Sequence, residues 1–131
     1  METNPKLVCL VEDDPLIIRL YERVFKLHGY DIKMAKDGEE AIKLFDELTV
    51  RPSVILLDIM MPKLSGFDVL EIMQKKENLK GIPVLMLTNL ASKEDEARAL
   101  KMGAAMYIIK SQHTPKQLIA IIEEYIAAHP Q

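Results

Sequence analysis

Short apolar segments alternate five times with segments of helical periodicity, and this alternation constrains the fold of the chain more than any other feature. The apolar segments are 6–11, 31–35, 53–57, 83–88 and 106–110. Strands that alternate with helices pair in parallel, and right-handed crossovers place the helices on both faces of the sheet. The sequence therefore predicts an α/β protein of the (βα)5 type, with a doubly wound, five-stranded parallel sheet.

The apolar pattern also separates inner strands from an edge strand. Residues 53–57 and 83–88 are apolar almost throughout, which is typical of strands covered by helices on both faces. Residues 31–35 instead alternate polar and apolar side chains, which indicates an edge strand with one solvated face.

Capping residues mark the ends of the helices. Asp14 and Pro15 are the N-cap and first residue expected of a helix that ends before Gly29. Thr114 and Gln117 form a capping box for the last helix. The other helices are predicted to open at 37 and to span 66–77 and 92–102.

Composition and charge exclude several classes of function. Lysine and arginine number 17 against 20 acidic residues, without the basic patch that a direct nucleic-acid partner requires. No apolar run is long enough to span a membrane. Cys9 is the single cysteine, lies in an apolar strand and is expected in the core, without a disulfide. We expect a cytoplasmic protein with one domain over residues 1–131, no effector domain and no membrane partner.

Polar side chains gather at the carboxyl ends of the predicted strands. Glu12 and Asp13 follow the first strand, Asp58 follows the third, Thr88 ends the fourth and Lys110 ends the fifth. Taken singly, each has an ordinary role as a cap, a turn residue or a solvated strand end. Because parallel strands bring these ends to one edge of the sheet, their joint placement indicates a functional site.

The chemistry of these side chains suits a phosphoryl group and a metal ion. Three carboxylates at one edge repel one another unless a cation or a proton compensates. Oxygen ligands alone favour a hard cation such as Mg²⁺. Lys110 and Thr88 are suited to holding phosphoryl oxygens, so Asp58 is a candidate carboxylate nucleophile.

Four segments, in order along the chain, resemble the motifs of response-regulator receiver domains in two-component signalling. They are VEDD at 11–14, LDIMMP at 57–62 with Gly66, LT at 87–88, and YIIK at 107–110. The resemblance covers nearly the whole chain. It implies a flavodoxin/CheY-like fold with the strand order 2-1-3-4-5.

The resemblance also implies roles for individual residues. Asp58 would accept a phosphoryl group from a phosphohistidine on a sensor histidine kinase or a histidine phosphotransfer protein. The cofactor would be Mg²⁺ (or Mn²⁺), bound by Asp13, by Asp58 and by the backbone carbonyl of Met60. Glu12 would act on the metal through water.

A conformational switch is implied as well. Lys110 and Thr88 would contact the phosphoryl oxygens, and Thr88 and Tyr107 would move inward on phosphorylation. This movement would change the face made by the fourth helix (92–102), the last strand (106–110) and the final helix that begins after Thr114, where a downstream protein or a second copy would bind. The helix over 92–102, with Ala97 and Leu100 as its main apolar anchors, is expected to be one of the least stable elements. The chain would be a signalling domain that assists its own phosphorylation and dephosphorylation, not an enzyme.

Three places depart from the family pattern. Asn89 replaces a small residue and would narrow access to the phosphate. Ser111 replaces a proline, so the Lys110–Ser111 bond is expected to be trans, because a cis bond without proline costs about 2.5–4 kcal/mol. Ala105 and Met106 replace acidic residues of DNA-binding members, which counts against the charge-paired dimer of that subfamily.

Two other classes of function share parts of this pattern. A phosphatase with an aspartate nucleophile typically carries a second acid two residues later, where this chain has Met60. A flavodoxin-like flavin carrier would need a phosphate loop rich in Ser, Thr and Gly after the first strand. Three acids occupy that position here and would repel a phosphate unless Mg²⁺ intervened.

Overall fold

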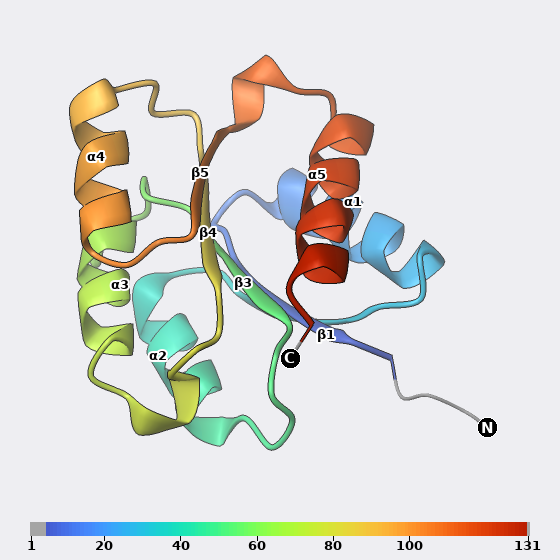
Figure 1. The fold of residues 1–131 in the computed structure, drawn as a ribbon, viewed down its shortest axis with the longest axis horizontal. Helices are drawn as coiled ribbons and strands as arrows, with labels where there is room; N and C mark the ends of the chain where they lie inside the picture. The colour runs from blue at the N-terminus through green and yellow to red at the C-terminus, as the bar shows by residue number, and fades with distance from the viewer. Residues whose placement is uncertain (1–4, 131) are drawn as a thin grey trace.

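Five parallel strands form the central sheet in the computed structural model, which describes residues 5–130 (Figure 1). The strand order is β2-β1-β3-β4-β5, as predicted. β2 pairs with one side of β1, and β3, β4 and β5 follow on the other side. The carboxyl ends of β1 and β3 therefore lie side by side at the point where the order reverses. The strands are β1 (Leu7–Val11), β2 (Asp31–Ala35), β3 (Val54–Leu57), β4 (Val84–Thr88) and β5 (Met106–Ile109).

Helices cover both faces of this sheet. Figure 1 shows α1 and α5 on one side and α2, α3 and α4 on the other, and each side has its own apolar core. The helices are α1 (Pro15–Leu27), α2 (Gly38–Glu47), α3 (Gly66–Met73), α4 (Lys93–Lys101) and α5 (Pro115–Ala128), with short 3₁₀ turns η1 (Glu77–Leu79) and η2 (Lys110–Gln112). None of the helices within residues 5–130 has the length and apolarity needed to cross a membrane.

Burial of the strands follows the sequence pattern. Every residue of β1, β3 and β4 is buried, whereas β2 alternates exposed and partly buried side chains before ending at a buried alanine. Cys9 is fully buried in β1, and this burial raises the pKa of its thiol to about 12. The expectation of a core cysteine and an edge strand is therefore confirmed.

The predicted caps are present with the expected geometry. The side chain of Asp14 accepts a hydrogen bond from the Leu16 amide at 2.9 Å, and Thr114 and Gln117 form the reciprocal capping box of α5. Gly29 follows α1 with φ +85°, the left-handed conformation that glycine adopts without strain. No peptide bond between described residues is cis, so the bond after Lys110 is trans, as predicted.

The end of the third helix differs from the prediction. The apolar pattern indicated a helix over 66–77, but α3 ends at Met73. After Gln74 the chain leaves helical geometry and enters η1, which buries Leu79 in the core. The side chain of Asn78 also donates to the Phe45 carbonyl at 3.0 Å, which holds η1 against α2. Packing against a distant helix therefore ends α3 early.

The packing of α4 also differs from the prediction. Ser92 is its N-cap, and the helix is as thinly anchored as expected, but the anchors are not Ala97 and Leu100. Ala97 is exposed and Leu100 is 45% exposed, while Ala99 is the one buried residue of the helix. The helix is turned so that a small side chain, rather than the leucine, faces the core.

Candidate functional site

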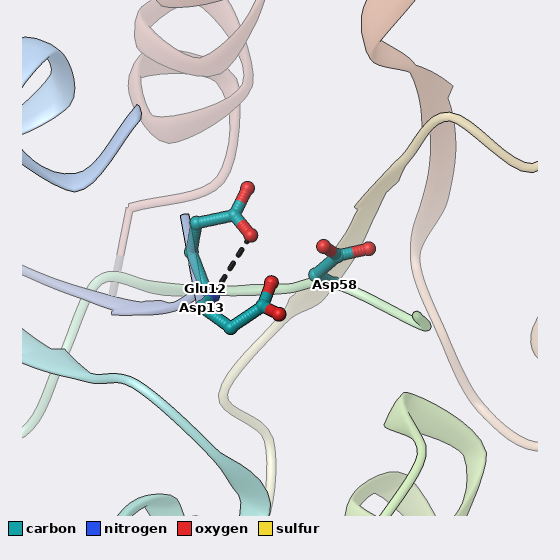
Figure 2. Close-up of side chains that lie close together, drawn as sticks. All are labelled: Glu12, Asp13 and Asp58. Carbon is teal, nitrogen blue, oxygen red and sulfur yellow. Dashed lines mark hydrogen bonds between the residues drawn. The ribbon is translucent and has the colours of Figure 1, made fainter. Parts of the chain in front are cut away.

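The ends of β1 and β3 bring three carboxylates together, as the sequence predicted. Oxygen atoms of Glu12, Asp13 and Asp58 all lie within 4.8 Å of one another. Figure 2 shows the two consecutive acids after β1 and Asp58 beside them on the neighbouring strand. The Asp58 amide donates to the Val11 carbonyl at 3.0 Å, so the pairing of β1 with β3 continues into the site and sets its position.

Glu12 is the most deeply buried acid of the cluster. It is 2% exposed, and this burial, with the charge of Asp58, raises its pKa to about 7 against the opposing effect of Lys110. One of its oxygens accepts from the Asp13 amide at 2.9 Å, the bond drawn in Figure 2. Glu12 is therefore held by the backbone and by a lysine.

Lys110 reaches the cluster from the first residue after β5. Its ammonium donates to Glu12 at 2.5 Å and to Asp58 at 3.4 Å. Burial alone would lower the pKa of this ammonium, but the bonds to Glu12 and Asp58 outweigh that effect and raise it. When all three carboxylates are ionised, the single ammonium leaves two negative charges, so the site has the charge and the hard oxygen ligands to fit Mg²⁺.

Thr88 and Tyr107 both form hydrogen bonds with the backbone of Leu90. Thr88 is fully buried at the end of β4, and its hydroxyl accepts from the Leu90 amide at 3.2 Å. The Tyr107 hydroxyl donates to the Leu90 carbonyl at 2.5 Å, and its ring packs against the core. Both side chains therefore contact the start of the β4–α4 loop.

A hollow of about 190 Å³ opens onto the acids. The Met60 side chain, at its edge, is 58% exposed, while its amide donates to Asp58 at 3.2 Å. Asn89 also lines the hollow, and its effect on access stays a prediction. The full lining is Glu12, Asp13, Asp14, Ile17, Asp58, Met60, Asn89 and Lys110. The sequence pattern assigns Asp14 only to a helix cap and Ile17 only to the apolar stripe of a helix. Both belong to the first helical turn after the acids, and this position could have identified them as lining residues.

Gly66 has a structural role that its place in the motif did not reveal. Its amide donates to the Ile59 carbonyl at 2.9 Å, which draws the start of α3 against the segment after β3. A Cβ at this position would lie 2.6 Å from the Ile59 Cα and closer still to the Asp58 carbonyl oxygen. Only glycine allows this approach, so Gly66 determines how closely the loop that carries Asp58 packs against the start of α3.

The fold and this site define an α/β domain with a cluster of carboxylates, suited to a metal ion, at the carboxyl ends of its strands. The model of the response regulator receiver domain family matches residues 8–123, and the chain belongs to this family. The predicted family and fold are therefore confirmed. This membership favours neither the phosphatase nor the flavin-carrier alternative.

Relatives and solved structures agree with this assignment. A probable transcriptional regulator ycf27 of Cyanophora paradoxa is 36% identical over 126 residues, which cover 96% of this chain and 50% of the relative. The polar-differentiation response regulator DivK of Brucella anthropi is 35% identical over 122 residues, which cover 93% and 97% of the two chains. The chain thus spans about half the length of most of the curated relatives that it matches.

Two solved receiver domains have the same fold. A CheY-like receiver domain protein of Methanospirillum hungatei has a TM-score of 0.84 and 26% identity, over 95% of this chain and 96% of that chain. The receiver domain of the sensor histidine kinase PA1611 of Pseudomonas aeruginosa has a TM-score of 0.80 and 26% identity, over 94% and 98%. That second structure has a magnesium ion coordinated in its active site cleft.

Proposed function

We propose that this chain accepts a phosphoryl group on Asp58 and thereby switches the face formed by α4, β5 and α5. The donor is a phosphohistidine of a sensor histidine kinase or a histidine phosphotransfer protein. The observation that carries the proposal is the convergence of Glu12, Asp13, Asp58 and Lys110 at one sheet edge, beside an open hollow.

The geometry suits Asp58 to act as the nucleophile. Its two oxygens are held by the Met60 amide and the Lys110 ammonium, which orient the carboxylate. As an oxygen of Asp58 forms a bond to phosphorus, the phosphorus–nitrogen bond of the donor breaks and the imidazole leaves. Lys110 is placed to stabilise the negative charge that develops on the phosphoryl oxygens. Asp58 and Lys110 would therefore act by positioning and charge stabilisation.

Mg²⁺ is the metal that best fits the acids. Asp13, Asp58 and the backbone carbonyl of Met60 would hold it, and Glu12 would act through water. When bound, it neutralises charge on the phosphoryl oxygens. The magnesium in the PA1611 receiver domain supports this assignment. Mn²⁺ takes the same oxygen ligands and is the alternative.

The switch in this proposal runs from Thr88 to Tyr107. Both side chains contact Leu90, so a movement of Thr88 toward a phosphoryl group changes the loop that holds the tyrosine. With Ala99 as its one buried residue, α4 is thinly anchored and would shift in response. A downstream protein or a second copy of the chain would bind the altered face.

Asp13→Ala tests the metal site. We expect Mg²⁺ to bind the wild type with millimolar to submillimolar affinity, about 4–5 kcal/mol, and not to bind the variant measurably. A magnesium titration followed by NMR measures both. Asp31→Ala removes an equal charge from the opposite end of a strand and should leave the affinity unchanged. Equal affinity in Asp13→Ala and the wild type would rule out this ligand set.

Met60→Asn tests the lifetime of the phosphorylated state. Met60 lines the hollow with an apolar side chain that cannot hold an attacking water, whereas Leu90 does not belong to the lining. A hydrogen bond of about 1 kcal/mol to that water should quicken dephosphorylation about fivefold. Decay of labelled protein gives the rate, and the apolar Met60→Leu variant should match the wild type. If phosphorylated Met60→Asn decays no faster than the wild type, the side chain at this position does not determine the access of the attacking water.

Leu90→Glu alters a residue outside the hollow and should quicken dephosphorylation less than Met60→Asn does.

A further inference from the structure

The guanidinium of Arg98 makes an unexpected contact for an exposed helix residue. Its Cζ lies 4.1 Å from the centroid of the Phe67 ring, on α3. Glu94 and Asp95 precede Arg98 by about one helical turn, yet within residues 5–130 it forms no ion pair with a carboxylate. The side chain thus stacks on an aromatic face across an interface.

Phe67 connects this contact to the loop that carries Asp58. The ring is 6% exposed and belongs to the core beneath α3. Its neighbour Gly66 is bonded to the Ile59 carbonyl and has no space for even a Cβ against Asp58 and Ile59. Because the backbones are closely packed at this junction, a displacement of residues 58–59 would also displace the start of α3 and the Phe67 ring.

The far end of α4 is fixed in a different way. The side-chain amide of Gln74, just after α3, donates to the Met102 carbonyl at 3.0 Å. This bond holds the carboxyl end of α4, while Arg98 holds its middle and Ser92 caps its start. A shift of the helix that kept this bond would therefore alter the Arg98–Phe67 contact.

We propose that Arg98 is a positioning residue that couples α4 to the Asp58 loop through the Phe67 ring, separately from Thr88 and Tyr107. The inference rests on the proposed function, because the coupled event is the loading of Asp58. In this structure the Arg98–Phe67 contact coexists with the bond between Tyr107 and Leu90. The two contacts stabilise the same position of α4, and the coupling acts equally in both directions.

The first test uses the unloaded chain. Arg98→Met keeps the length of the side chain and removes the guanidinium, and Lys101→Met removes a charge from the same helix. Hydrogen–deuterium exchange should rise about two- to fivefold in Arg98→Met, both in α4 and over residues 59–68. Lys101→Met should leave residues 59–68 unchanged. A rise confined to α4 would overturn the coupling.

The second test loads Asp58 with beryllofluoride in the presence of Mg²⁺. Arg98→Met should tighten beryllofluoride binding about two- to fivefold, because it removes a contact that stabilises the position of α4 before loading, and Lys101→Met should not. In a Phe67→Leu background, adding Arg98→Met should have no further effect, because the ring that it needs is gone. An unchanged affinity in Arg98→Met, or an equal gain in the Phe67→Leu background, would overturn the proposal.

The two experiments separate this inference from the proposed function. If wild-type protein fails to bind beryllofluoride while residues 59–68 respond to Arg98→Met, the acceptor role of Asp58 is wrong and the coupling holds. If beryllofluoride binds and residues 59–68 do not respond, the coupling is wrong and the acceptor role holds.

Discussion

We expect Asp58→Asn to abolish phosphorylation by acetyl phosphate, which is the largest effect expected for any single substitution in this chain. The amide nitrogen that replaces one oxygen is not a nucleophile, and the remaining oxygen carries no full negative charge. The substitution also removes one of the three carboxylates at the site. Its shape is nearly unchanged, so the Met60 amide keeps an acceptor and the fold should persist.

Incorporation of labelled phosphate in the presence of Mg²⁺ measures this effect. Asp31→Asn makes the same chemical change at an exposed acid on β2, and it should be labelled like the wild type. Circular dichroism of both variants shows whether the fold is retained. Labelling of Asp58→Asn at the wild-type rate would mean that another residue accepts the phosphoryl group.

Gly66→Ala has the second largest expected effect, on both stability and phosphorylation. The new methyl group would lie 2.6 Å from the Ile59 Cα, so the backbone must shift. Overpacking of this kind costs about 1–3 kcal/mol of the free energy of unfolding. Because the displaced segment carries Asp58, the rate of phosphorylation should fall about a hundredfold, as expected for a misplacement of about 1 Å.

Gly29→Ala is the matched control for this substitution. Gly29 has φ +85°, and no atom lies within 4 Å of the place that a methyl group would take. Alanine there therefore costs only the strain of a left-handed residue, about 1 kcal/mol. Urea unfolding and acetyl phosphate labelling compare the two variants. If Gly66→Ala is labelled at the wild-type rate, then the loop absorbs the methyl group without moving Asp58.

Much of the fold was predictable because its signals are local. The period of the apolar residues separates strands from helices, and caps such as Asp14, Gly29 and Thr114 act within a few residues of themselves. The strand order came from the family resemblance rather than from the pattern. The meeting of Glu12, Asp13, Asp58 and Lys110 followed from parallel pairing, which brings all strand ends to one edge.

Contacts between distant segments were decided only by the tertiary structure. The anchor of α4 is Ala99 rather than Leu100, because the orientation of a thinly packed helix depends on its neighbours more than on its own stripe. The early end of α3 depends in the same way on the burial of Leu79. Gly66 against Asp58 and Arg98 over Phe67 depend on how α3 and α4 pack.

The sequence by itself thus determined which segments form strands and helices and which charged groups reach the site, because periodicity, capping and strand polarity are properties of short segments. The tertiary structure alone decided how closely the site loop packs on α3 and what holds α4. Those features depend on how side chains from separate segments pack against one another, and no short segment determines that packing.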